Sequence, residues 1–319
     1  MGIEFMKILI ANNTLSILGG SETYYLTLAK ELKKQGHNVH GYSPLLGIIA
    51  RKMRENGIEC YSGLPNKNYD AIIASHYHIV DSLREAYPDT PIISVIHSPL
   101  HIVDKFKKTW GLEHPAINSR VEQYVAVSEE TQEKLKDDYN INAKVIRNFF
   151  EIKEYPINNK PKQILFNSNY TQKKDDYFKT IVKVANHYKA GLLAIGEGFF
   201  QTPNVKEAVK QSDIVVGIGR SVLEGVAMGR IGVIHGRWGT GGVISPKSYK
   251  ELREANFSGR NNQGKWMTAE EIVAEIDKHY QDTKWRLDYM RENHNVKKAA
   301  KTFIDLCNYL VSQKSAVKS

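Results

Sequence analysis

Apolar runs of strand length alternate with helical patterns along almost the whole of this chain. Strand-like runs occur, for example, at Lys7–Ala11, Tyr69–Ser75 and Pro91–His97, and each is bounded by turn residues. Ser21–Gln35 has apolar residues at helical spacing and stops at Gly36. Strands that alternate with helices in this way predict a parallel, doubly wound sheet with helices on both faces.

The alternation stops once, near the middle of the chain, and then resumes. Residues 151–162, EIKEYPINNKPK, are polar, contain two prolines and show no periodicity, so we interpret them as a linker. A chain of 319 residues is long enough for two domains of about 150 residues each. We therefore expect an α/β protein with two tandem Rossmann-like domains, at 6–150 and 163–285, and a cleft between them. A helical tail at 286–319 can pack back on the first domain.

Composition limits the compartment and the class of protein. The chain is 41% hydrophobic and 25% charged, and no apolar run approaches the roughly 20 residues of a membrane span. No secretory signal is visible. Cys60 and Cys307 have neither metal nor redox spacing, which favours two free thiols in a reducing compartment. We expect a cytoplasmic protein.

The net charge of +9 comes partly from basic helical stretches. They are KELKK at 30–34, RKMRE at 51–55 and KFKK at 105–108. Neither an RNA-binding aromatic pattern nor zinc-finger spacing accompanies them, so nucleic acid is not an expected partner. They predict solvated helix faces or a peripheral contact with the anionic inner face of a membrane.

Two glycines lie where the first strand gives way to the first helix. Gly19 and Gly20 precede Ser21, which can cap that helix. Ligands of open α/β sheets bind at this carboxyl end of the strands. Glycine permits a positive φ and a close approach to the backbone, and free amides at a helix start favour an anion. The pair is either a tight turn or part of an anion-binding loop.

A stronger pattern occurs at 212–236, SDIVVGIGRSVLEGVAMGRIGVIHG. A strand runs into Gly219, and a helix begins near Ser221. The amides that follow Gly219, together with the guanidinium of Arg220, suit a phosphate group. Glu224 lies one turn into this helix, where a carboxylate can accept hydrogen bonds from both hydroxyls of a ribose.

Together these segments resemble the GT-B glycosyltransferases of family 4, which are retaining sugar-nucleotide transferases. The likeness covers most of the chain, and the order and spacing of its pieces make it specific. The pieces are GGSETYYLTLAKELKKQGHNVHGYSP (19–44), SVIHSP (94–99), YVAVSEET (124–131), VIRNFFE (145–151), AIGEG (194–198) and SDIVVGIGRSVLEGVAMGRIGVI (212–234).

The resemblance implies transfer of a sugar from a nucleoside-diphosphate sugar, expected to be UDP-linked, to a hydroxyl of a glycan or lipid-linked acceptor. It implies no metal and no other cofactor. The Gly19–Gly20 loop would lie against the donor diphosphate or sugar, and His97 near the transferred sugar. Lys173 or Lys174 would bind the diphosphate, and Glu224 the ribose. The expected catalytic residues are His97, Lys173, Lys174 and Arg220, and the expected binding residues are Gly19, Gly20, Gly219, Arg220, Ser221 and Glu224.

The sequence departs from the family's pattern at two places. Val216 stands where the family has the first of its two glutamates, which leaves the contacts to the donor sugar undefined. Ser168 or Asn169 stands where the family has an arginine before its diphosphate lysine. We expect Arg220, which the usual pattern lacks, to supply the missing positive charge.

Three other functions stay open on the sequence alone. A GT-B sugar-nucleotide epimerase would need acid–base carboxylates that we cannot identify. A nicotinamide-dependent oxidoreductase would need a third fingerprint glycine, where Val222 stands, and an acidic residue at the next strand end, where His235 stands. A catalytically silent nucleotide-sugar-binding module would explain the missing glutamate. His76 and His78 lack a third ligand, so we expect no metal site.

Overall fold

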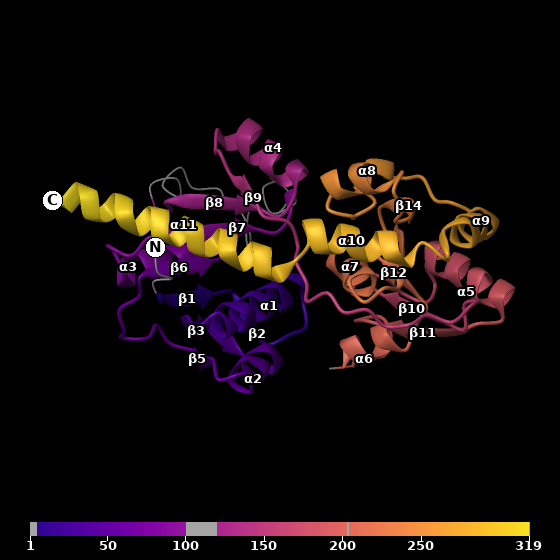
Figure 1. Ribbon diagram of the computed structural model, residues 1–319, viewed down its shortest axis with the longest axis horizontal. Helices are drawn as coiled ribbons and strands as arrows, with labels where there is room; N and C mark the ends of the chain where they lie inside the picture. Colours follow the sequence, from indigo (N-terminus) through magenta and orange to yellow (C-terminus); the bar gives the residue numbers. More distant parts are fainter. Residues whose placement is uncertain (1–4, 100–119, 203, 319) are drawn as a thin grey trace. The chain divides into compact units, whose positions relative to one another are not determined.

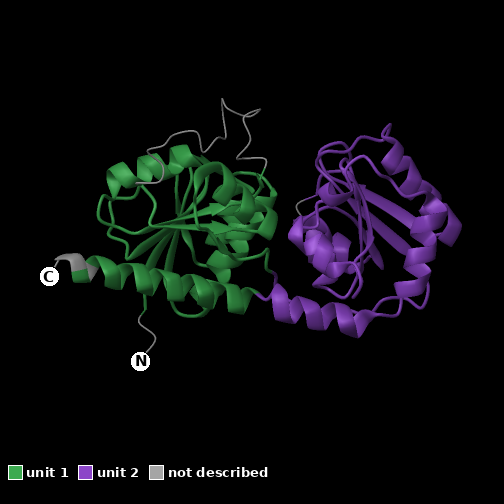
Figure 2. Ribbon diagram, turned by 90° about the horizontal axis from the view of Figure 1, so that it is seen from above, with its two compact units in different colours: residues 1–149, 296–319 green, residues 150–295 purple. Residues whose placement is uncertain are grey.

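The computed structural model describes residues 5–99, 120–202 and 204–318 of the chain (Figure 1). The chain divides into two compact units (Figure 2). The first unit consists of residues 1–149 and 296–319, and the second of residues 150–295. Among the described residues, no helix has both the length and the apolar character needed to cross a membrane.

The first unit contains a seven-stranded sheet in the order β5-β3-β1-β6-β7-β8-β9, and all its neighbours pair in parallel. From β1 the chain builds one side of the sheet through β3 and β5, then returns to β6 on the other side. The topological switch point therefore lies between β1 and β6. The strands are β1 Lys7–Ala11, β3 Asn38–Tyr42, β5 Glu59–Tyr61, β6 Ala71–Ala74, β7 Ile92–Ile96, β8 Gln123–Ala126 and β9 Lys144–Val145.

Helices cover both faces of this sheet, as the alternating pattern predicts. Ile8 and Ile10 of β1 belong to one buried cluster, and Leu9 and Ala11 belong to another, because successive side chains of a strand point to opposite faces. A separate short parallel sheet pairs β2 Thr14–Leu15 with β4 Leu45–Leu46. The helices are α1 Gly20–Lys34, α2 Ile48–Arg54, α3 Tyr77–Ala86, α4 Glu129–Tyr139 and α11 Val296–Lys318, and α1 contacts both α2 and α11.

The second unit has a five-stranded sheet in the order β11-β10-β12-β13-β14. Its switch point lies between β10 and β12, because β11 and β12 follow β10 on opposite sides. Only β14 is antiparallel, where the sequence analysis expects a parallel sheet throughout. A two-residue turn after β13 returns the chain directly, so no crossover helix forms. The strands are β10 Gln163–Asn167, β11 Gly191–Ile195, β12 Ile214–Gly217, β13 Ile231–Gly236 and β14 Gly239–Val243.

The helices of the second unit also pack on both faces of its sheet. Ile164 and Phe166 of β10 contribute to one cluster, which includes Ile181 of α5 and Ile272 of α9, whereas Leu165 contributes to another. Thr268 and Glu271 form a reciprocal capping box that starts α9. The helices are α5 Asp176–Tyr188, α6 Val205–Lys210, α7 Arg220–Val226, α8 Tyr249–Glu254, α9 Ala269–His279, α10 Thr283–Asn293 and the short 3₁₀ helix η4 Arg260–Asn262.

The segment 151–162, expected to be a linker, belongs to the second unit. The Asp213 carboxylate accepts hydrogen bonds from the backbone N–H groups of Asn158 and Lys162, at 2.9 and 2.8 Å. Arg230 donates to the carbonyl of Pro156 at 3.0 Å. Two buried side chains therefore hold this polar segment along the unit, which the sequence pattern of the segment itself does not reveal.

The second unit also extends beyond the expected end at residue 285, to residue 295. Met290 of α10 is buried in the same cluster as Val222 and Leu223 of α7, and Trp285 packs against that cluster. The helical tail is consequently split. Residues 286–295 stay with the second unit, and α11 contacts α1 in the first.

Candidate functional site

The candidate site of the first unit consists of residues that follow strands on either side of its switch point, and His97 is the one among them that the sequence predicts as a site residue. Asn12 and Asn13 follow β1, Ser75 and His76 follow β6, and His97 follows β7. The carboxyl ends of neighbouring parallel strands lie at one edge of the sheet, and ligands of open α/β sheets bind there.

The Gly19–Gly20 loop has glycine for reasons of space rather than of backbone conformation. Gly19 is the N-cap residue of α1, and its φ of −87° and ψ of 176° are accessible to any residue. A Cβ atom on Gly19 would lie 2.1 Å from Oε2 of Glu22, whereas one on Gly20 would meet nothing within 4 Å. Ser21 is not the cap, because the helix already begins at Gly20. Gly19 thus makes room for a carboxylate, and Gly20 leaves the loop open.

A buried carboxylate and a buried amide lie beneath this loop, and the sequence analysis missed both. Asn12 Nδ2 donates to Glu22 Oε1 at 3.3 Å, and Glu22 is only 5% exposed. Burial raises the pKa of Glu22, although hydrogen bonds from its own backbone N–H, Ser21 and Asn12 act in the opposite direction. Oδ1 of Asn12 has no hydrogen-bond partner among the described residues. The available sequence signal was an asparagine directly after a strand, followed by an acid in the next helix's first turn.

His97 lies in a cluster of tyrosine rings and a serine hydroxyl. Its Nε2 is 3.1 Å from Oγ of Ser75. Its ring centroid lies 4.8 Å from that of Tyr24 and 5.7 Å from that of Tyr25, both in edge-on geometry. The sequence predicts His97 alone, and the structure adds Tyr24 and Tyr25 of α1 and Ser75, which follows β6.

Two further histidines follow β6, His76 as the N-cap residue of α3 and His78 in its first turn. His76 has a φ of 67° and a ψ of 125°, a conformation that costs a non-glycine residue energy and is typical of functional positions. Nε2 of His78 lies 2.9 Å from Oδ1 of Asn13, and burial lowers the pKa of His78. Within the described residues, no group of three histidine, cysteine, aspartate or glutamate side chains is suited to hold a metal ion.

In the second unit, the glycine turn after β12 positions Arg220. Gly219 has a φ of 59° and a ψ of −130°, which requires glycine, and its N–H donates to the carbonyl of Phe257 at 2.6 Å. The guanidinium of Arg220 lies 4.5 Å from the ring centroid of Phe150. The hydroxyl of Ser221 donates to the carbonyl of Ile218 at 2.8 Å, so that proton is already used within the turn.

Glu224 lies one turn after Arg220 on the same face of α7. Burial raises the pKa of Glu224, whereas the charges of Arg220 and Lys206 act in the opposite direction. Lys173 and Lys174 are exposed in the loop between β10 and α5. The lysines therefore follow β10 and Arg220 follows β12, and these two strands flank the switch point.

The hairpin turn between β13 and β14 carries an aromatic stack that the sequence analysis missed. The guanidinium of Arg237 lies 4.3 Å from the ring centroid of Tyr170 and 4.5 Å from that of Trp238. Tyr170 follows β10 and is 63% exposed. The stack thus adds an accessible flat surface to the sheet edge that also carries Arg220.

His235, at the end of β13, has a structural role. It is fully buried, its Nε2 donates to the carbonyl of Tyr177 at 2.8 Å, and its Nδ1 lies 2.6 Å from Oγ1 of Thr240. Burial lowers the pKa of His235 to about 4, despite the opposing hydrogen bond to Tyr177. The imidazole is therefore neutral at physiological pH.

Lowering the pH from 6.5 to 4 is expected to destabilise the wild-type second unit through His235. Below pH 6.5 the unfolded chain binds a proton on this histidine, whereas the folded unit does not until about pH 4. The unfolded state is thus favoured by about 3 kcal/mol at the lower end of this range. Urea unfolding of the wild type and His235→Gln between pH 7.5 and 4 measures the difference. Equal pH slopes for the two proteins would contradict the expectation.

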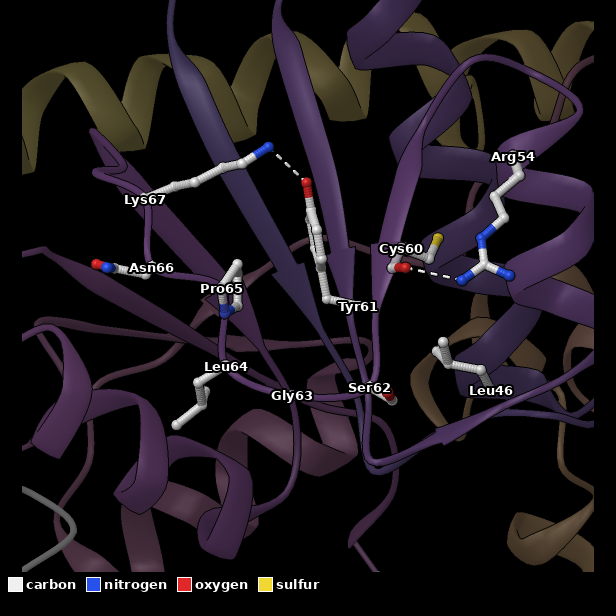
Figure 3. Close-up of a pocket in the computed structure, with 10 residues that line it drawn as sticks. All are labelled: Leu46, Arg54, Cys60, Tyr61, Ser62, Gly63, Leu64, Pro65, Asn66 and Lys67. Carbon is white, nitrogen blue, oxygen red and sulfur yellow. Dashed lines mark hydrogen bonds between the residues drawn. The ribbon is translucent and has the colours of Figure 1, made fainter.

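A pocket of about 450 Å³ lies in the first unit at the end of β5 (Figure 3). Nη2 of Arg54 donates to the carbonyl of Cys60 at 2.8 Å, and Nζ of Lys67 lies 2.5 Å from Oη of Tyr61. β5 is an edge strand, and β3 separates it from β1 and the switch point. None of the site residues expected from the sequence lines this pocket. Its lining is Leu46, Arg54, Cys60, Tyr61, Ser62, Gly63, Leu64, Pro65, Asn66 and Lys67.

Comparison with known proteins identifies the fold. No family model matches the chain, and no curated protein matches its sequence. A glycosyltransferase from Rickettsia africae ESF-5 matches with a TM-score of 0.62 at 14% identity, over 96% of this chain and 98% of the other. HepE of Anabaena in complex with UDP and glucose matches with a TM-score of 0.64 at 13% identity, over 95% and 100%. CalG4, the calicheamicin glycosyltransferase, matches with a TM-score of 0.54 at 13% identity, over 96% and 100%. The chain has the fold of these proteins, and the predicted GT-B fold is confirmed.

Proposed function

We propose that this chain is a retaining glycosyltransferase of the family 4 type, which moves a sugar from a UDP-sugar to a hydroxyl of a glycan or lipid-linked acceptor. A fold alone does not give an activity. The observation that supports the proposed activity is the pair of Arg220 and Glu224 on α7, beside the switch point of the second unit. HepE, which shares the fold, has structures with UDP and glucose and with UDP-glucose.

The proposed chemistry needs stabilisation of the diphosphate leaving group. Arg220 and one of Lys173 and Lys174 would supply fixed positive charge there, with no metal ion. Glu224 would accept hydrogen bonds from both ribose hydroxyls. In a front-face attack, the bond from the sugar's anomeric carbon to the phosphate oxygen breaks, and a bond to the acceptor oxygen forms on the same face. The departing phosphate oxygen takes the acceptor's proton.

Calorimetric titration with UDP, GDP, ADP and NAD, at one fixed salt concentration and with EDTA present, tests the binding step. We expect binding of UDP alone. The 2′-deoxy form of UDP should bind more weakly, because Glu224 would lose one hydroxyl partner. Binding of NAD without any diphosphate would instead support an oxidoreductase. Binding of UDP only when a divalent metal replaces EDTA would overturn the metal-independent part of the proposal.

Turnover tests the catalytic step. Incubation with UDP-sugars and mixed hydroxyl acceptors should release UDP, and the anomeric configuration of the product, read by NMR, should match that of the donor. An inverted product would overturn the retaining mechanism. An altered UDP-sugar without release of UDP would indicate an epimerase, and binding with no conversion would indicate a silent binding module.

We further propose a cytoplasmic location with peripheral contact to anionic lipid. Lys30 and Lys34 of α1 and Arg51 of α2 are exposed on two helices that contact each other. The third basic stretch, 105–108, lies outside the described residues. Near an anionic surface each basic residue contributes roughly 1 kcal/mol of attraction.

Replacing Lys30, Lys34 and Arg51 together by glutamine is expected to weaken binding to anionic vesicles on the order of 100-fold. Sedimentation with vesicles that contain phosphatidylserine measures the change, and neutral vesicles give the baseline. A control variant, in which three exposed lysines of the second unit are replaced by glutamine, has the same net charge as the first variant. It should lose much less vesicle binding. If both variants lose binding equally, net charge rather than this surface explains the attraction. The control positions are Lys183, Lys278 and Lys284.

A further inference from the structure

The hydroxyl of Ser75 is in contact with three hydrogen-bonding groups. Its Oγ lies 2.9 Å from the carbonyl oxygen of Val95, 2.5 Å from Oη of Tyr25 and 3.1 Å from Nε2 of His97. Ser75 is 1% exposed and Tyr25 is fully buried, so water does not compete for these bonds. The three partners come from β7, α1 and the residue that follows β7.

Counting protons defines the direction of every bond in this cluster. Each of the three contacts needs one hydrogen, and Ser75 has only one to give. A carbonyl oxygen can only accept, so the serine proton must go to Val95. The other two hydrogens must then come from the partners, which means that Tyr25 donates its phenol proton and His97 donates from Nε2. Ser75 Oγ accepts both with its two lone pairs.

We infer that Ser75 holds the neutral form of His97 in the tautomer that carries its proton on Nε2, in which Nδ1 can only accept a hydrogen bond. Ser75 is therefore a positioning residue that acts through His97. Tyr25 supplies the second donor to Ser75 and favours the same direction of its hydroxyl. The tautomer follows from the hydrogen bonds alone, whereas its use in sugar transfer rests on the proposed function.

The tautomer restricts the chemistry that His97 can recognise. An Nδ1 lone pair attracts a group that carries a hydrogen, such as a hydroxyl, and repels a phosphate oxygen. Any hydrogen-bond partner of His97 at Nδ1 must therefore be a donor.

Nitrogen NMR on the full chain labelled with ¹⁵N-histidine tests the tautomer directly at pH 8. His97→Gln removes one ring from the spectrum and assigns the signals. We expect the His97 Nε2 to be protonated and its Nδ1 unprotonated. A proton on Nδ1, or a mixture of both tautomers in the wild type, would overturn the inference, whether or not the protein binds UDP.

Two variants separate the role of Ser75 from general packing. Ser75→Ala should release His97 into a mixture of tautomers, and Tyr25→Phe should leave the Nε2–H tautomer in place because Ser75 still accepts from it. Retention of a single tautomer in Ser75→Ala would show that Ser75 does not hold it. If Ser75→Ala does not fold, loss of the tautomer in Tyr25→Phe would still contradict the proton count.

The catalytic consequence is measured with a UDP-sugar that the wild type turns over. Ser75→Ala should lower kcat about tenfold, as for the loss of one oriented hydrogen bond, with little change in UDP affinity. An equal loss of UDP affinity would indicate a structural defect instead. If the wild type turns over no donor, the proposed function fails while the tautomer result stands.

Discussion

Replacing Arg220 by alanine is expected to weaken UDP binding by roughly 10- to 150-fold, the equivalent of one hydrogen bond to a charged group. The guanidinium stands at the carboxyl end of β12, where Gly219 turns the chain into α7. Its contact with the ring of Phe150 limits the conformations that the side chain must give up on binding an anion. Calorimetry at fixed salt measures the affinity, because phosphate contacts depend on ionic strength.

Two further variants make the Arg220 result specific. Arg220→Lys keeps the charge but loses the planar, two-point geometry, so it should bind UDP with intermediate affinity. Arg291→Ala removes an exposed arginine on α10 that pairs with Asp288 at 2.9 Å, and its UDP affinity should equal that of the wild type. An unchanged affinity in Arg220→Ala would rule out the phosphate contact. A parallel loss in Arg291→Ala would point to net charge instead.

The sequence was sufficient to place the candidate residues at the carboxyl edge of each sheet. Alternation of strands and helices predicts parallel strands, and the residues that follow parallel strands in the chain lie at one edge of the sheet. His97 directly follows an apolar run, and Arg220 follows another after a short glycine turn, so the position of each could be predicted from its own strand. The prediction that Gly19 is needed for a positive φ was wrong. Its φ is ordinary, and the glycine instead makes room for the carboxylate of Glu22.

The residues that the sequence did not reveal act through contacts between distant parts of the chain. Tyr25 has the spacing of an ordinary core residue of a helix, and its bond to Ser75 depends on how α1 packs over β6. The stack of Tyr170 on Arg237 likewise depends on two loops that follow different strands. Periodicity reports which face of an element is buried, and it carries no information on which side chains meet across elements.

The largest expected loss of stability, about 3–5 kcal/mol, is for Asp213→Ala. This buried carboxylate accepts backbone hydrogen bonds from Lys162 and Gln163 at 2.8 and 3.1 Å, and it accepts from both the backbone and the side chain of Asn158. It also supplies the opposite charge to Arg230, which is only 1% exposed. Alanine would leave these donors without their acceptor and the buried guanidinium without a counter-charge.

Urea unfolding followed by tryptophan fluorescence measures the effect of Asp213→Ala. Three of the four tryptophans, Trp238, Trp266 and Trp285, belong to the second unit, so the signal reports mainly on it. Asp288→Ala, which removes an exposed partner of Arg291, should cost less than about 1 kcal/mol. Asp213→Asn keeps one accepting oxygen and should fall between the two. Equal stability of Asp213→Ala and Asp288→Ala would show that Asp213 does not hold residues 151–162 on the second unit. The apolar packing of Ile152, Tyr155 and Ile157 would then have to hold that segment alone.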